Sequence, residues 1–179
     1  MPKTLFSYDK IQIFFYIYSV PAIPHINLYT LPEWKEAHFS TEDEDEAWKY
    51  AADLEAAKAL YNKWREVFYL VMVFTDNLPE ENEPHSIRNM IFENAMMVSP
   101  KLISAAGDML YIVKMENASI IRTNCKQLMD QVIFSGLTEK AERHHEQVIR
   151  DSMEEFKNLF KDWVATFKKD DCEDDWGLY

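Results

Sequence analysis

Glycine is scarce in this chain, with 3 residues among 179, and this scarcity bears directly on the fold. Sheet-rich folds with many tight turns use glycine wherever the backbone needs a positive φ. The low glycine content therefore argues against such a fold and favours long helices joined by short connections. The length favours a single domain and suffices to bury a hydrophobic core.

Cysteine and basic residues are also few. The 2 cysteines, Cys125 and Cys172, lie far apart and form no disulfide framework, which predicts free thiols in a reducing, cytoplasmic compartment. Lys and Arg number 19 against 31 Asp and Glu, a formal net charge of -12. Such a chain repels phosphate backbones on average, so nucleic-acid binding would require a local basic patch.

Long apolar runs are missing as well, since a membrane-spanning helix needs roughly 20 apolar residues. The most aromatic stretch, residues 60–83, is interrupted by Lys63, Arg65 and Glu66. Residues 11–20 are apolar and follow basic residues, as in a signal peptide, but tyrosine and glutamine dilute them. This composition favours a folded strand over a secretion signal, and we expect no contact with a membrane.

Catalytic motifs are lacking: the chain has no glycine-rich phosphate loop, no Gly-x-Ser-x-Gly and no zinc-ligand spacing. The acidic residues are expected on exposed helix faces, where burial cannot tune their pKa values. Cys125 falls on an apolar stripe, which indicates an inert thiol. We therefore expect no enzymatic activity, no catalytic residues and no cofactor. One alternative is a metal-binding bundle, because Glu142 and His145 form a single Glu-x-x-His pair.

The first expected helix covers residues 42–76. Thr41 and Glu44 fit a capping box at its start, and Pro79 follows its end. Its inward face repeats at steps of three and four, as helical packing requires. The residues on this face are Tyr61, Trp64, Phe68, Val71 and Phe74.

The second expected helix begins at Ser86 and contains Pro100, which should kink it or start a new turn. Its apolar residues occupy more than one face, so it should be covered by more than its own neighbours. Breaks are expected at residues 107–108 and 116–117.

A third helix should then present one apolar stripe and end at Gly136 in a left-handed cap. The stripe consists of Ile121, Cys125, Leu128 and Val132. Thr138 is the expected N-cap of the fourth helix. On that helix Trp163 should face inward, with Lys161 and Asp162 exposed. The sequence thus predicts an all-α, up-down four-helix bundle over residues 41–169.

The two ends of the chain differ from this bundle. Residues 1–40 are rich in β-branched and aromatic residues and should form an extended or β-ribbon segment. Residues 170–179 form a tail that is too acidic to pack and should be mobile.

Several short motifs resemble the four-helix-bundle superfamily of the accessory variability determinant of diversity-generating retroelements. They are also similar to proteins encoded in 23S ribosomal RNA intervening sequences. The motifs are Tyr61-Asn62-Lys63-Trp64-Arg65, Leu78-Pro79-Glu80-Glu81, Ser86-Ile87-Arg88, Gly136-Leu137-Thr138-Glu139 and the helix end at Trp163-Val164. The resemblance implies a pentameric ring of up-down bundles. For the retroelement members it also implies a reverse-transcriptase partner and RNA or DNA bound on a basic surface.

These observations favour a non-enzymatic oligomeric scaffold that binds a protein partner. The alternative is a nucleic-acid-binding accessory subunit of a reverse transcriptase. The cations that would then contact nucleic acid are Lys63, Arg65, Arg88, Arg122, Lys126, Arg143 and Arg150. They are scattered along the helices, a distribution that favours solvated salt bridges over a phosphate-binding track.

Overall fold

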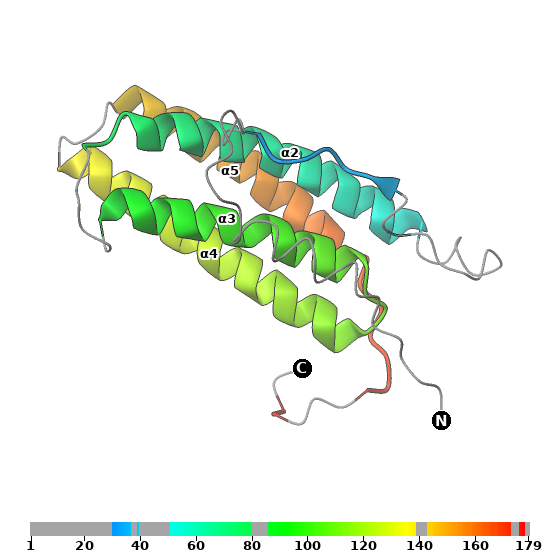
Figure 1. Cartoon of the computed structure of the whole chain (residues 1–179). Coiled ribbons are helices and arrows are strands. Elements are labelled where there is room, and N and C mark those ends of the chain that lie inside the picture. Colours follow the sequence, from blue (N-terminus) through cyan, green and yellow to red (C-terminus); the bar gives the residue numbers. More distant parts are fainter. Residues whose placement is uncertain are drawn as a thin grey trace, which may run out of the picture.

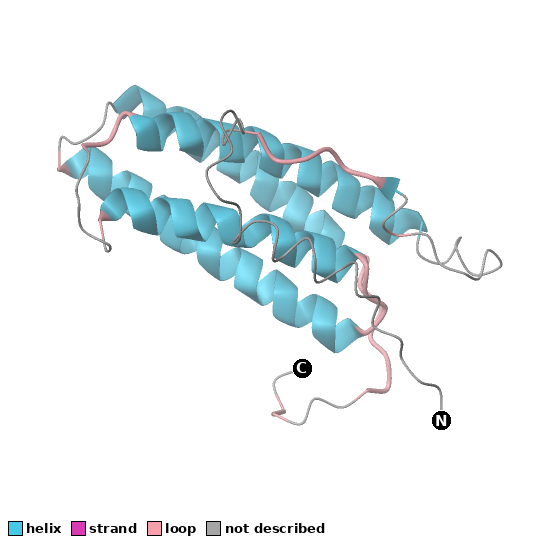
Figure 2. Ribbon diagram, viewed as in Figure 1, coloured by secondary structure: helices cyan, strands magenta, loops and turns pink. Residues whose placement is uncertain are grey.

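The computed structural model describes residues 30–36, 39, 51–79, 86–138, 143–172 and 176–177. Within these residues the chain has four helices and no strand, in an antiparallel up-down arrangement (Figures 1 and 2). The expected all-α four-helix bundle is therefore confirmed. The helices are α2 (Ala51–Asp76), α3 (Ile87–Ala106), α4 (Tyr111–Leu137) and α5 (Arg143–Val164).

Each helix packs on two others, so the four close around one core. The α3–α4 pair has the most extensive contact, α2 lies against both α5 and α3, and the α4–α5 contact is the smallest. None of these helices, within the described part of the chain, combines the length and apolarity that a bilayer span requires.

The predicted ribbon in residues 1–40 and the capping box at Thr41 fall almost entirely outside the described residues. The described segment 30–36 packs against α2 at Tyr61. The Tyr61 hydroxyl donates a hydrogen bond of 2.9 Å to the carbonyl of Pro32, and the Trp34 ring lies 5.4 Å from the Tyr61 ring. Burial at this contact raises the pKa of Tyr61 to about 12.

The expected start of α3 is confirmed, because Ser86 is its N-cap and its hydroxyl accepts a 3.3 Å hydrogen bond from the Asn89 amide. Pro100 lies inside α3 without ending it, so no separate helix starts there. The break predicted at residues 107–108 is confirmed, because Gly107 is the C-cap of α3.

The break predicted at residues 116–117 is wrong, since α4 runs without interruption through this point. Asn117 is accommodated because its side chain is buried and donates a 2.8 Å hydrogen bond to the carbonyl of Val113, one turn earlier. A residue that often disrupts helices is therefore satisfied within this one.

The predicted helix ends around Gly136 and Thr138 are also wrong. Gly136 lies within α4, and Gly177 is the positive-φ glycine of the described chain. A Cβ at position 136 would lie 2.5 Å from a carboxylate oxygen of Glu146 on α5, which is the end of a flexible side chain and could move away. Thr138 is the C-cap of α4, and its hydroxyl donates back to the carbonyls of Phe134 and Ser135 rather than starting α5.

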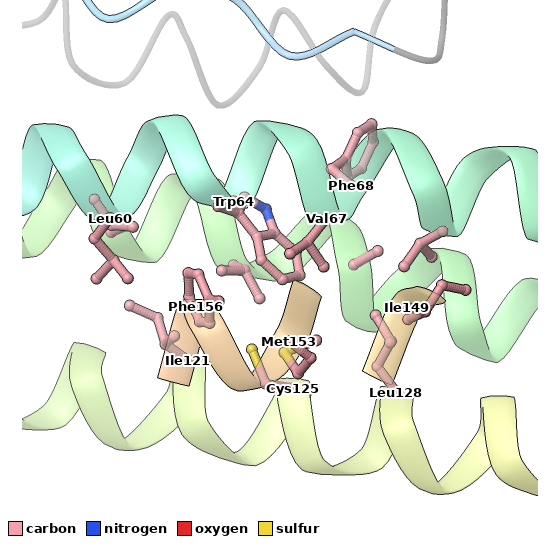
Figure 3. Packing of buried hydrophobic residues seen from close by; sticks show 14 of the residues in the cluster. Leu60, Trp64, Val67, Phe68, Ile121, Cys125, Leu128, Ile149, Met153 and Phe156 are labelled. Carbon is pink, nitrogen blue, oxygen red and sulfur yellow. The ribbon is translucent and has the colours of Figure 1, made fainter. Parts of the chain in front are cut away.

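The core joins the apolar stripes of the helices (Figure 3). The stripe expected on the third helix is confirmed, with all four of its residues buried, and so is the aromatic stripe of α2. Burying a large apolar side chain contributes roughly 1.5–3 kcal/mol relative to leaving it exposed. The stripes thus supply the main stabilising term of the fold. The central contacts are made by Leu60, Trp64, Ile121, Leu128, Ile149 and Phe156.

Trp163 faces this core, as expected. Its side chain is 0% exposed, and its ring meets Phe160 and Phe167 edge-on at centroid distances of 5.9 and 4.8 Å. The neighbouring Lys161 and Asp162 are exposed, also as expected.

We predict that Trp163→Ala lowers the free energy of unfolding by about 3–5 kcal/mol, because it leaves a cavity among packed aromatic rings. Urea denaturation followed by circular dichroism measures this loss. Asp162→Ala is the matched control on the opposite face and should change stability by less than about 0.5 kcal/mol. An unchanged midpoint for Trp163→Ala would show that the side chain does not support the core.

Candidate functional site

The cations expected to contact nucleic acid do not gather on one surface. Lys63 and Arg65 lie on α2, Arg88 on α3, and Arg150 on α5. Three of these four are paired with carboxylates. Arg88 pairs with Asp76 at 3.0 Å, Arg150 with Glu146 at 2.5 Å, and Lys63 with both Glu66 and Glu155. Arg143 begins α5, but its side chain lies outside the described structure.

Arg122 and Lys126 differ from the paired cations. Both are exposed on α4 and stand four residues apart, so they project from successive turns of one face. Neither takes part in an ion pair with any residue that the structure describes. Arg65 on α2 also makes no ion pair with the described residues but is only half-exposed, so Arg122 and Lys126 are the exposed cations of this set that an anionic ligand could reach.

An open groove of about 750 Å³ runs between α2, α5 and the segment that begins at Thr30. Its lining mixes apolar Leu31 and Val148 with side chains of both charges. Burial lowers the pKa of Lys63, but hydrogen bonds to Glu155 and Glu66 outweigh burial and leave that pKa raised. Lys63 is thus already neutralised, whereas Arg65 in the same lining makes no ion pair with the described residues.

Large apolar side chains are exposed mainly on the α3–α4 hairpin, residues 87–137. Phe134 and Leu137 near the end of α4 are 54% and 72% exposed, and Met109 and Leu110 between the helices are 55% and 47% exposed. Phe92 on α3 belongs to the same group. By contrast, the exposed residues of α5 are polar or charged throughout. This hairpin is therefore where the described bundle leaves apolar surface uncovered.

One polar feature lies inside the bundle, and the sequence reasoning missed it. Asp53 on α2 and Lys114 on α4 form an ion pair while only 8% and 6% exposed. The expectation that acidic residues occupy exposed faces is therefore wrong for Asp53. The signal was present in the spacing: Asp53 precedes Ala57 and Leu60 at helical steps, and Lys114 stands seven residues before Ile121.

Lys114 needs this partner because it lies in the first turn of α4, where the helix dipole disfavours a cation. The Thr166 hydroxyl lies 3.0 Å from the other carboxylate oxygen of Asp53 and 2.6 Å from the carbonyl of Trp163, and it shares its one proton between these two acceptors. The Phe167 ring lies under the ammonium, 5.4 Å from its nitrogen. Both charges are thus neutralised and enclosed at this end of the bundle.

The cysteines give no reactive centre. Burial raises the pKa of Cys125 to about 12, so its thiol stays protonated, as an inert core cysteine does. Cys172 is exposed, and the charge of Asp170 beside it raises its pKa. Among the described residues no group of three or more His, Cys, Asp or Glu side chains could hold a metal. Glu142 of the Glu-x-x-His pair lies outside them.

No protein-family model, no curated protein and no solved structure matches this chain.

We predict that Lys114→Met lowers the free energy of unfolding by about 3–5 kcal/mol, since it leaves the Asp53 carboxylate buried without a counter-charge. The double substitution Asp53→Leu with Lys114→Met should recover most of this loss, because no unpaired charge then remains. Urea midpoints of the wild type, both single variants and the double variant measure the coupling.

Lys58→Met is the matched control, because the exposed Lys58–Glu36 pair at 2.5 Å is screened by water and should contribute little to stability. If Lys114→Met lowered the free energy of unfolding as little as Lys58→Met, the charges of Asp53 and Lys114 would have to be hydrated in the folded protein.

Proposed function

We propose that this chain is a non-enzymatic helical scaffold that assembles with copies of itself and binds a protein partner through the α3–α4 hairpin. One observation carries the proposal: this hairpin holds most of the exposed large apolar side chains of the described bundle. When another protein covers apolar groups of this size, the association is stabilised because apolar surface is removed from water. The charged outer face of α5 has no comparable reason to associate.

The position of these side chains permits a ring. Met109 and Leu110 lie between α3 and α4, and Phe134 and Leu137 lie near the end of α4, at the other end of the hairpin. A contact between unlike ends of neighbouring copies is heterologous, and it closes into a ring when the rotation between copies permits. Ring assembly is also what the resemblance to the retroelement accessory proteins implies.

We predict that the wild-type protein is oligomeric at micromolar concentration and that Phe134→Asp with Leu137→Asp makes it monomeric. Charged groups at these positions would be desolvated in an interface without a partner, which costs several kcal/mol. Sedimentation velocity measures the molecular mass, and thermal unfolding by circular dichroism should show that the bundle itself is intact.

Tyr69→Asp is the matched control, because Tyr69 is 51% exposed but lies on α2, away from the hairpin. This variant should remain oligomeric. A monomeric wild type over the whole concentration range would contradict the self-assembly proposal.

A second candidate function, nucleic-acid binding as an accessory subunit of a reverse transcriptase, is supported by Arg122 and Lys126. Two exposed, unpaired cations on successive turns can contact neighbouring phosphates of a single strand. The overall charge of -12 opposes this binding, so it should be weak and detectable only at low salt.

We predict that any affinity for labelled single-stranded RNA, measured by fluorescence anisotropy, falls in the variant Arg122→Glu with Lys126→Glu. Loss of two phosphate contacts should make the negative slope of log affinity against log salt shallower by about 1.4, at about 0.7 per contact. Arg88→Gln removes a cation already paired with Asp76 and should leave the slope unchanged. Absence of binding at about 20 mM salt, where the electrostatic attraction to phosphates is strong, would exclude this candidate.

A further inference from the structure

The segment after α5, residues 165–172, returns across the end of the bundle toward α4 (Figure 1). We call it the C-terminal strap. It was expected to belong partly to an acidic tail that does not pack, yet Asp170 binds the start of α4. An Asp170 carboxylate oxygen accepts a 2.9 Å hydrogen bond from the amide of Tyr111.

This bond replaces a missing helix cap. The first amides of a helix have no partner within the helix. Leu110, the N-cap of α4, has no side-chain acceptor to offer them. Asp170 supplies one from the other end of the chain and also accepts a 3.0 Å bond from the Cys172 amide. The bonds from Tyr111 and Cys172 lower the pKa of Asp170, so the carboxylate is charged at neutral pH.

The strap also covers the buried ion pair. Thr166 donates to Asp53, and Phe167 lies under the Lys114 ammonium while packing edge-on against Trp163. Most other strap residues are exposed: Ala165, Lys168, Lys169, Asp171 and Cys172.

Three side chains therefore attach the strap: Thr166, Phe167 and Asp170. A segment with so few buried contacts opens at a free energy well below that of global unfolding. The four helices beneath it share a continuous core that does not depend on residues beyond Phe167.

We propose that the C-terminal strap is a releasable lid over the Asp53–Lys114 ion pair. Its closed state is the one described here. Its open state uncovers the ion pair and the first turn of α4 while the four-helix core stays folded. The lid thus controls whether the one buried cation–carboxylate pair of the described bundle is dry or hydrated.

Hydrogen exchange in the full-length protein tests the lid. In the wild type, the amide of Tyr111 should exchange through a local opening, faster than the core amides of Ile121 and Leu128. Asp170→Ala should accelerate exchange at Tyr111 by about tenfold or more, because it removes a hydrogen bond to a charged acceptor. In both proteins, exchange at Tyr111 should depend little on low concentrations of urea, whereas exchange of the core amides should rise steeply with urea, as global unfolding requires.

Asp171→Ala is the matched control, since Asp171 is the exposed neighbour of Asp170 and should leave all three amides unaffected. Three outcomes would overturn the proposal. The amide of Tyr111 could exchange as slowly as the core in the wild type. Asp170→Ala could leave its exchange unchanged, or exchange at Tyr111 could rise with urea as steeply as that of the core amides.

Discussion

The column of aromatic rings between α2 and α5 is the contact on which the arrangement of the bundle depends. The Trp64 ring on α2 meets Phe156 at 5.1 Å, and the column continues along α5 through Phe160 and Trp163 to Phe167. Tilted and edge-on contacts of this kind add to the free energy gained from area burial alone. They bring α5 onto α2, and the strap follows because Phe167 is the last ring of the column.

This column also has an energetic cost. The indole nitrogens of Trp64 and Trp163 are buried and make no hydrogen bond with the described residues. An unsatisfied buried donor costs about 1–3 kcal/mol. The two tryptophans remain favourable because each buries a large apolar surface. Shape and buried area therefore stabilise the aromatic column. At Asp53 and Lys114, by contrast, the buried charges are paired with each other.

Helix positions and core faces could be predicted from the sequence because they follow from local rules. The spacing of Ile121, Cys125 and Leu128 identifies a buried stripe, and Ser86 marks a helix start by its own side chain. The failures occurred where the preference of a single residue does not decide the local structure. Asparagine favours a break and glycine a helix end, yet Asn117 and Gly136 both lie within α4.

The candidate site was harder to predict for the same reason. Positive charges can be counted in the sequence, but their availability depends on partners. Arg88 and Arg150 are neutralised by carboxylates, whereas Arg122 and Lys126 are not paired with any described residue. Lys114 is spaced in register with the stripe of α4, but only the fold shows that Asp53 stands opposite it. Side-chain pairing across helices is the information that a single sequence read locally does not contain.

The hydrogen bond between Thr166 and Asp53 spans 113 positions of the chain. During synthesis, Asp53 and Lys114 leave the ribosome long before the residue that completes their enclosure. Bringing such distant positions together costs loop-closure entropy and slows folding. A chain interrupted just before Thr166 would hold nearly the whole core and still leave the Asp53–Lys114 pair open to water.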